Sequence, residues 1–228
     1  PSLMAEYQKK ANKGINQNYS YVDKGYYNRW DELYGSTAHD EYDENRKPGN
    51  YIILDYDADG MITQDDNIPY GYTGIPQNTM NLQIGFDYKG WSCFVQFYGV
   101  NNVSRSVGLT SLGGTRNTAF FEGSYWSPDN QNADVPLPRW LNQASKYTNG
   151  TRFLFDGSYT RLKYAELSYT FSKEKWLKAS GLSSLKVFVN GNNLFLWTDM
   201  PDDRESNTGG WSAYPTQRRF NLGFKITL

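Results

Sequence analysis

The sequence has very few of the residues that most often build catalytic and metal centres. Its 228 residues include one cysteine, Cys93, and one histidine, His39. One cysteine cannot form an intrachain disulfide, and a His-based triad or zinc site would have to use the one histidine. Carboxylates are plentiful, but they crowd into loops, and no two are marked as a matched acid and base. We therefore expect no catalytic residue and no enzyme activity.

Charge of one sign and long apolar runs are also missing. The formal net charge is −1, so nothing favours an anionic partner such as nucleic acid. Mean hydropathy is −0.73, and no apolar run approaches the roughly 20 residues of a membrane helix. A transmembrane β-strand needs only about 9–11 residues of alternating character, which an average hydropathy does not detect. The chain starts at a proline without an apolar segment of the signal-peptide type, so we expect it to begin inside a longer sequence.

Alternation of apolar and polar residues is the main structural signal that is present. It occurs in TMNLQIGFDYKG, WSCFVQFYGVNN, SLKVFVNGNNLFLW and RRFNLGFKITL. Phe94 interrupts the pattern of the second segment. In SYTRLKYAELSYTF the alternation changes phase near residues 164–165, which predicts a β-bulge. Aromatic residues make up 17% of the chain, and tyrosine and tryptophan suit positions that are apolar on one side and wet on the other.

Short and long connections alternate between these segments. Tyr88-Lys89-Gly90-Trp91 predicts a tight hairpin turn. SKEKWLKASG predicts a short turn or helix, with Ser172 as its N-cap and Gly181 just after its end. Residues 104–157 and 201–215 form long connections. This pattern is typical of an outer-membrane barrel, with a water-soluble β-sandwich as the alternative. The polar faces, rich in Asn, Gln and Thr, and the almost charge-free apolar faces favour the barrel.

The stretch DYDADGMITQDD has the ligand spacing of a calcium-binding EF-hand loop, without the flanking helices. Calcium takes six to eight oxygen ligands, and such loops use positions 1, 3, 5, 7 through a carbonyl, 9 and 12, with glycine at position 6. The corresponding residues are Asp55, Asp57, Asp59, the Met61 carbonyl, Thr63 and Asp66, with Gly60 at the turn. Position 12 is Asp instead of Glu, which lowers the expected affinity. A structural Ca²⁺ site is the prediction, and a solvated loop without metal is the alternative.

Tryptophans in the long connections are the candidates for contact with a substrate or a partner protein. Trp126, Trp140 and Trp211 can stack on a sugar ring or contact a lid protein, and Arg161 can contact a substrate from a wet lumen. The alternatives are loop packing for the tryptophans and a solvated barrel wall for the arginine.

Seven segments in order resemble the C-terminal part of SusC/RagA-type TonB-dependent outer-membrane transporters. They are GYYNRWDE, DYDADGMITQDDNIPYGYT, GFDYKGWSCFVQFYGVNNVSR, YWSPDNQNADVPLPRW, DGSYTRLKYAELSYTFS, GLSSLKVFVNGNNLFLW and YPTQRRFNLGFKITL. The family shows a DVNGDG-type acidic loop, a W-T/S-P-x-N segment, an S-Y-x-R-L-K strand and an N-G-x-N-L-F strand. The final residue here is Leu228, where the family usually has an aromatic residue.

The resemblance implies an all-β fold: an antiparallel transmembrane β-barrel segment of five or six strands, from a larger barrel of about 22 strands with long extracellular loops. Residues 1–228 would be the C-terminal part of the barrel, without the plug domain and the N-terminal strands. The Asp55–Asp66 region and the connections 104–157 and 201–215 would be extracellular, and the Lys89-Gly90 turn and residues 172–181 periplasmic.

The function implied by the resemblance is active uptake across the outer membrane of a Gram-negative bacterium. The substrate would be an oligosaccharide or peptide, captured beneath a SusD-like lipoprotein lid and released inward when TonB acts through the missing N-terminal part. The barrel wall would contact outer-membrane lipid. The rival interpretation is a secreted, calcium-stabilised β-sandwich that binds glycans.

Overall fold

The structure is a computed structural model that describes residues 5–9, 11–40, 46–106, 125–134, 136–137, 150–172, 174–200 and 216–228. Within these residues strands predominate, and the two α-helices have five residues each. No helix in the described part of the chain is long and apolar enough to cross a bilayer. The chain divides into two compact units, Pro1–Thr73 with Ser104–Phe155, and Gly74–Val103 with Asp156–Leu228. The sequence did not predict this division.

The first unit is built from short elements. They are β1 (Tyr19–Ser20), β2 (Asp23–Tyr26), α1 (Trp30–Tyr34), β3 (Ala38–His39), β4 (Tyr51–Ile53), β5 (Met61–Ile62), η2 (Gln64–Asp66), β6 (Ile68–Pro69), β9 (Ser104–Ser106), η3 (Thr151–Phe153) and β10 (Leu154–Asp156). The strands pair two by two as β1 with β6, β2 with β4, β3 with β5, and β9 with β10. The largest cluster of buried apolar residues contains Tyr26, Tyr51, Trp126, Ala133 and Phe153.

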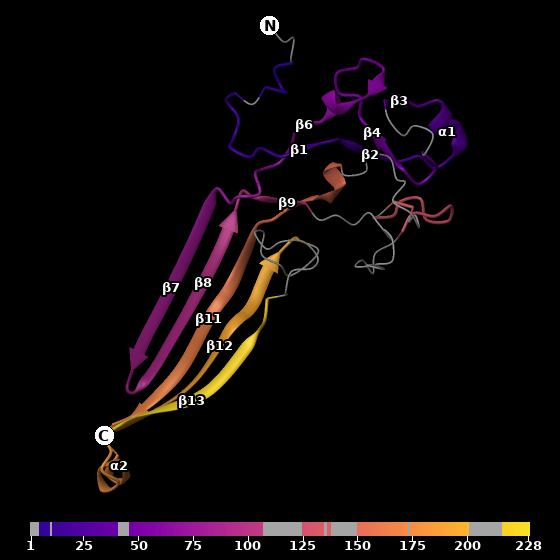
Figure 1. Cartoon of the computed structure of the whole chain (residues 1–228). Coiled ribbons are helices and arrows are strands. Elements are labelled where there is room, and N and C mark those ends of the chain that lie inside the picture. Colours follow the sequence, from indigo (N-terminus) through magenta and orange to yellow (C-terminus); the bar gives the residue numbers. More distant parts are fainter. Residues whose placement is uncertain are drawn as a thin grey trace. The chain divides into compact units, whose positions relative to one another are not determined.

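The second unit is a five-stranded antiparallel sheet with the order β13-β12-β11-β8-β7 (Figure 1). Its elements are β7 (Asn78–Tyr88), β8 (Trp91–Asn101), β11 (Tyr159–Phe171), α2 (Lys175–Ala179), β12 (Ser184–Thr198) and β13 (Arg219–Thr227). These strands coincide with the segments whose apolar and polar residues alternate. The predicted all-β fold, with an antiparallel sheet of five or six strands, is therefore confirmed for the described residues.

Two short connections lie at the same end of this sheet. Lys89 and Gly90 both have positive φ, 48° and 90°, as the tight primed hairpin turns require. At the end of α2, Gly181 has φ 71° and the Leu182 N–H bonds to the Leu177 carbonyl at 3.0 Å, which is the Schellman arrangement. The predicted N-cap was wrong. The helix begins after Glu174 instead of Ser172, and no side chain caps it.

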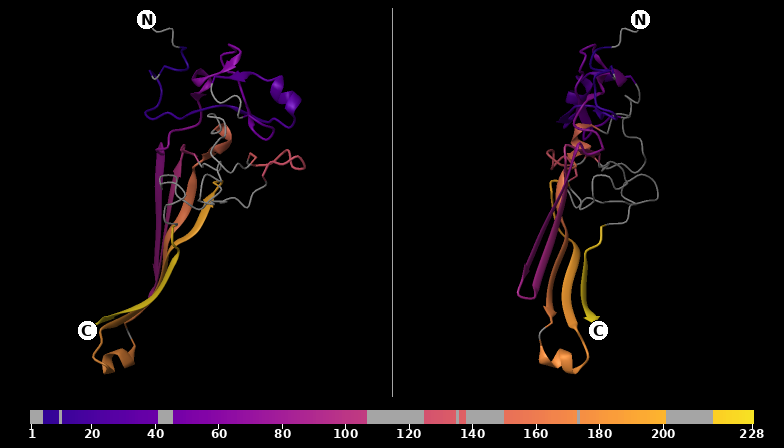
Figure 2. Two further views of the ribbon diagram at one scale, coloured as in Figure 1. Left: turned by 45° about the vertical axis from the view of Figure 1, so that its right-hand side comes forward. Right: turned by 90° about the vertical axis from the view of Figure 1, so that its left-hand side faces the viewer.

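The predicted bulge occurs slightly earlier than the sequence indicated. The register of β11 shifts between Leu162 and Tyr164, against both β8 and β12. The shift allows Leu162 to face the same side as Leu167, although their separation is odd, so the apolar face stays continuous across the bulge. Figure 2 shows from two further directions that the long strands bend along their length.

Phe94, which breaks the alternation of β8, lies on the polar face for a local reason. Its cross-strand partner on β7 is Gly85, and a Cβ added to Gly85 would lie 3.9 Å from the Phe94 ring. Phe188 similarly covers Gly223, where an added Cβ would come within 2.6 Å of the ring. An aromatic side chain laid over a glycine of the neighbouring strand fills the gap that the missing side chain leaves.

Candidate functional site

One face of the five-stranded sheet is apolar and open. Cross-strand register places Ile84, Val95, Ala165, Gly191 and Phe220 in one row across all five strands. The large apolar side chains of this face in and around that row are Met80, Leu82, Ile84, Phe86, Tyr88, Trp91, Leu167, Val187, Val189, Phe195, Trp197, Phe220, Leu222, Phe224 and Ile226. Their exposed fractions run from 38% for Val187 to 81% for Leu222. A sheet in water buries its apolar face against another layer, and among the described residues no such layer covers this face.

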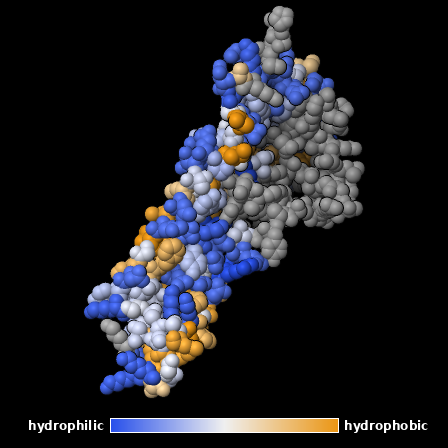
Figure 3. Space-filling model, turned by 60° about the vertical axis from the view of Figure 1, so that its left-hand side comes forward, coloured by the Kyte–Doolittle hydropathy of each residue, from blue (hydrophilic) through white to orange (hydrophobic). Residues whose placement is uncertain are grey.

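The apolar face has the dimensions of a membrane-crossing wall. The eight steps along β7 from Met80 to Tyr88 span about 27 Å at the usual rise of an antiparallel strand. Tyr88, Trp91 and Tyr169 form an aromatic row at one end of the band, where the Trp91 and Tyr169 rings meet edge to face at 5.0 Å. Trp197 lies near the other end. Figure 3 shows apolar side chains lying open on the surface of this part of the molecule. An apolar band about 25 Å tall between aromatic girdles is typical of the outer surface of a membrane barrel.

The opposite face of the sheet carries a network of polar side chains. The Glu166 carboxylate accepts hydrogen bonds from Lys186 Nζ at 2.9 Å and from the Tyr164 hydroxyl. Asn221 donates to Asn190 at 2.9 Å, and Gln96 donates to Asn81 at 3.2 Å. Charged and amide side chains that bond one another across neighbouring strands suit a wet interior wall.

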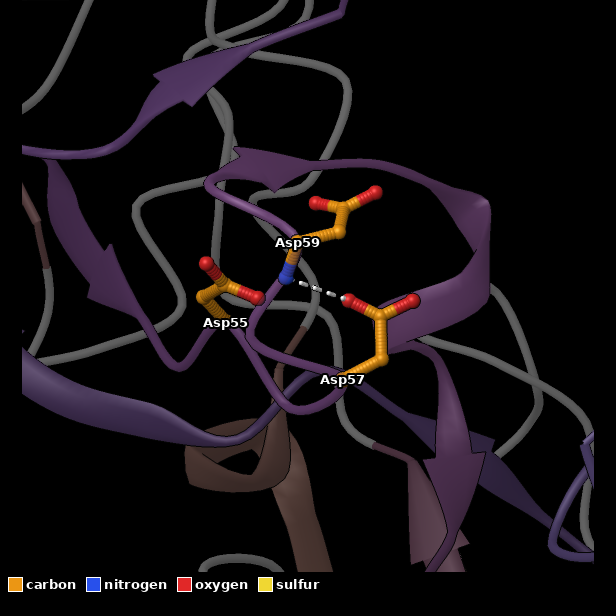
Figure 4. Close-up of side chains that lie close together, drawn as sticks. All are labelled: Asp55, Asp57 and Asp59. Atoms are coloured by element: carbon orange, nitrogen blue, oxygen red, sulfur yellow. Dashed lines mark hydrogen bonds between the residues drawn. The ribbon is translucent and has the colours of Figure 1, made fainter.

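Three carboxylates of the acidic loop converge. Oxygens of Asp55, Asp57 and Asp59 lie within 4.8 Å of one another, and Figure 4 shows the three side chains extending from one tight loop. Gly60, at φ 90°, turns the chain so that its N–H reaches Asp55 at 3.0 Å. The Asp59 N–H bonds to Asp57 at 3.2 Å. The spacing read from the sequence therefore produces the cluster of oxygens that a hard cation prefers.

The last two predicted ligands have other contacts. Asp66 is fully buried, and its carboxylate accepts hydrogen bonds from the N–H groups of Tyr56 at 2.6 Å and Thr63 at 2.8 Å. The Thr63 hydroxyl accepts from the Asp65 N–H at 3.0 Å and caps the short helix η2. Met61 lies in β5, which pairs in parallel with β3. In this structure Asp66 closes the loop through the backbone, and the converging oxygens come from the first three carboxylates.

The electrostatics of the loop agree with an anionic cluster. The pKa of Asp57 is raised, first by partial desolvation and then by the charges of Asp59, Asp66 and Asp55. One oxygen of Asp55, Oδ1, is buried without a hydrogen-bond partner. Like charges this close favour proton uptake or a bound cation.

The four predicted contact residues lie in different surroundings. Trp126 is 4% exposed, packs in the core of the first unit, and donates its indole N–H to Asn28 at 3.0 Å. The structure therefore favours loop packing for Trp126 over stacking on a sugar. Arg161 lies on the polar face of the sheet but is 3% exposed, with its guanidinium 6.0 Å from the Tyr159 ring. Trp140 and Trp211 lie outside the described residues.

A buried centre around Arg152 was not predicted from the sequence. Its guanidinium contacts Asp23, bonds to the Ala133 carbonyl at 3.2 Å, and lies 4.8 Å from the Tyr26 ring and 5.6 Å from the Tyr51 ring. Desolvation by burial raises the pKa of both tyrosines. Arg152 joins segments that are more than 100 residues apart in sequence, so no local pattern could have revealed it.

Comparison with known proteins identifies similar sequences and folds, although no family model matches the chain. The chain is 30% identical over 195 residues to TonB-dependent receptor P3 of Formosa agariphila, across 78% of this chain and 19% of the relative. Its fold is similar to the RagAB peptide importer in the open-open state, with 16% identity, a TM-score of 0.64 and coverage of 92% of this chain and 22% of that one. A second structure, of the RagAB peptide transporter, gives 17% identity and a TM-score of 0.62 at the same coverage.

These comparisons confirm the resemblance that the seven sequence segments indicated. The chain spans about a fifth of the length of the proteins it matches. The named relatives are a receptor and importers, which agrees with the prediction that the chain performs no catalysis.

Proposed function

We propose, from the chain's resemblance in sequence and fold to TonB-dependent receptors of the SusC/RagA type, that it forms part of the barrel wall of an outer-membrane active transporter. The observation that carries the proposal is the five-stranded sheet with one open apolar face and one polar, hydrogen-bonded face. In lipid every backbone polar group must be paired, so this sheet needs further strands at both edges to close a barrel. Residues 1–228 would supply the C-terminal portion of that barrel.

The transported substrate is an oligosaccharide or a peptide, taken up with a SusD-like lipoprotein and energised through TonB. The similar structure that is named a peptide importer supports a peptide as the substrate. Trp30 and Tyr34 are exposed and their rings stack at 6.0 Å. They offer an aromatic surface that could hold either class of substrate. The rival sandwich has little support, because no second sheet covers the apolar face in the described part of the chain.

Uptake by living cells tests this function. A strain without the gene should fail to take up one class of nutrient, oligosaccharide or peptide, and regain uptake when the full gene is restored. Dissipating the inner-membrane proton gradient should abolish the same uptake in the intact strain. Purification of the full protein as a stable monomer in water without detergent would contradict the proposal.

The acidic loop is proposed to bind Ca²⁺ as a structural ion in the first unit. Carboxylate oxygens would come from Asp55, Asp57 and Asp59. The Oδ1 atom of Asp55 is buried and has no hydrogen-bond partner, which supports a cation as its partner. The ion would neutralise the cluster and order the loop between β4 and β6. Because Asp66 is held by backbone N–H groups, the loop has fewer protein carboxylates for the ion than an EF-hand, and we expect weak binding.

Asp57→Asn should weaken calcium binding to the full protein by on the order of tenfold, because affinity in such loops follows ligand charge. Calorimetric titration with CaCl₂ after treatment with EGTA measures the affinity, and proteolysis of residues 50–70 measures the order of the loop. Asp65→Asn is the matched control, since it removes one charge from the same loop but not from the converging group. Proteolysis that is indifferent to calcium in the unmodified protein would refute the site.

A further inference from the structure

A groove of about 380 Å³ opens on the apolar face of the sheet, at the end where β7 begins. Its lining comes from three successive rows of the sheet, and the middle row, Thr79, Val100, Tyr159 and Thr198, has its side chains on the opposite face. The row within the apolar band is Met80, Gly99, Thr160 and Trp197, which are paired across four strands. The third row is polar and contains Asn78, Asn101, Ser158 and Asp199. The groove therefore lies where the apolar face changes to a polar one.

Gly99 has no side chain, so the Met80 methyl group and the Thr160 hydroxyl lie close over it. Met80 and Trp197, in the same row, are 56% and 53% exposed. A Cβ at Gly99 would come within 2.9 Å of Met80 Cε and 3.2 Å of Thr160 Oγ1. In a barrel wall this row lies at the boundary between hydrocarbon and head groups, so the groove is open to lipid along its apolar side and to water along its polar side.

The chemistry of the lining selects among lipids. Among the lining residues, Asp199 is the only one with a charged side chain at neutral pH. Its negative charge repels an anionic head group and attracts an ammonium group. Trp197 lies two residues before Asp199, near the end of β12, and an indole face is the best aromatic partner for an ammonium ion. The asparagine, serine and threonine side chains can bond to phosphate or ester oxygens near that ammonium.

We propose that this groove binds the head group of a membrane lipid that carries a primary ammonium group. The inference rests on the proposed function, because it needs the apolar face to lie in a bilayer. The ammonium group could belong to a phospholipid or to a glycolipid modified with phosphoethanolamine. Either lipid would place its chains against the apolar band and its amine at Asp199.

Lipid selection by the full protein tests the inference. The protein is reconstituted in bilayers of equal parts phosphatidylethanolamine and phosphatidylglycerol and extracted in mild detergent, and the retained lipid is quantified by mass spectrometry. We expect phosphatidylethanolamine to be enriched by roughly two- to fivefold, the ratio given by an exposed ammonium contact. Asp199→Asn should abolish the enrichment and Asp199→Lys should reverse it. A second reconstitution, with amine-modified and unmodified glycolipid, shows which of the two lipid sources binds more strongly.

Two further variants separate the possible outcomes. Asp87→Asn removes a carboxylate from the polar face at the other end of β7 and should leave the enrichment unchanged. Thr160→Phe fills the groove without changing charge and should lower it. Equal lipid profiles for all variants, with the protein inserted, would overturn the groove site but not the barrel. Failure of the unmodified protein to insert would overturn both.

Discussion

Arginine at Ile84 should destabilise the protein in a bilayer by about 2–4 kcal/mol, the cost of a cationic side chain at the midplane of a barrel's lipid face. Ile84 is 54% exposed and lies midway along the apolar side of β7, four residues from both Met80 and Tyr88. A sheet face in contact with water would tolerate this change, because surface substitutions usually cost less than about 0.5 kcal/mol. Equilibrium unfolding of the full protein in lipid vesicles measures the difference.

Gln83→Arg is the matched control for this prediction. Gln83 is the next residue on the same strand, and its partner on β8 is Gln96, on the polar face. Arginine there faces the wet interior and should change the unfolding free energy by less than about 1 kcal/mol. Equal costs at the two positions would show that the two faces do not differ in their surroundings, and would contradict a barrel wall.

Arg152→Ala should lower the local stability of the first unit by about 3–5 kcal/mol. The Asp23 side chain is 7% exposed, so removing the guanidinium leaves a buried carboxylate without its cationic partner, held by the Gly25 N–H at 2.7 Å. The contacts of Arg152 with the Tyr26 and Tyr51 rings are lost as well. Hydrogen exchange in the full protein measures the effect at the Thr151 N–H, which bonds to the Tyr21 carbonyl, and at the Tyr27 N–H, which bonds to Asn50.

Arg29→Ala provides the comparison for an exposed ion pair. Arg29 is 70% exposed where it meets Glu32, and exposed pairs of this kind contribute little to stability. The loss of local stability in Arg152→Lys should lie between the losses in Arg152→Ala and Arg29→Ala. Lysine keeps the positive charge but lacks the planar guanidinium that lies over the rings. Similar exchange rates for Arg152→Ala and Arg29→Ala would refute a stabilising role for the buried centre.

The sheet could be predicted from sequence because its signal is local. Met80, Leu82, Ile84 and Phe86 alternate with polar residues along one strand, and glycine at position 90 marks the turn. The bulge was predicted for the same reason, since a phase change in the alternation is visible within a few residues. The N-cap at Ser172 was wrong because serine is favoured at this position only statistically, and the chain enters α2 two residues later.

The first unit could not be predicted, because its contacts are not local. Its strands have two to four residues, too few to show a period. Its centre joins Asp23 to Arg152 across 129 residues. The acidic loop is intermediate. Its spacing correctly predicted the convergence of Asp55, Asp57 and Asp59. The sequence could not show that the Asp66 carboxylate would accept hydrogen bonds from backbone N–H groups.

The central claim is that one face of the sheet lies against lipid, and accessibility measured residue by residue along β7 tests it most directly. Single nitroxide labels are placed at each position from Thr79 to Tyr88 in the full protein in bilayers. Collision rates are then compared for oxygen, which concentrates in hydrocarbon, and for a water-soluble nickel complex. We predict a period of two, with high oxygen and low nickel accessibility at Met80, Leu82, Ile84 and Phe86, and the reverse at the odd positions. Uniform nickel accessibility along the strand would contradict the account.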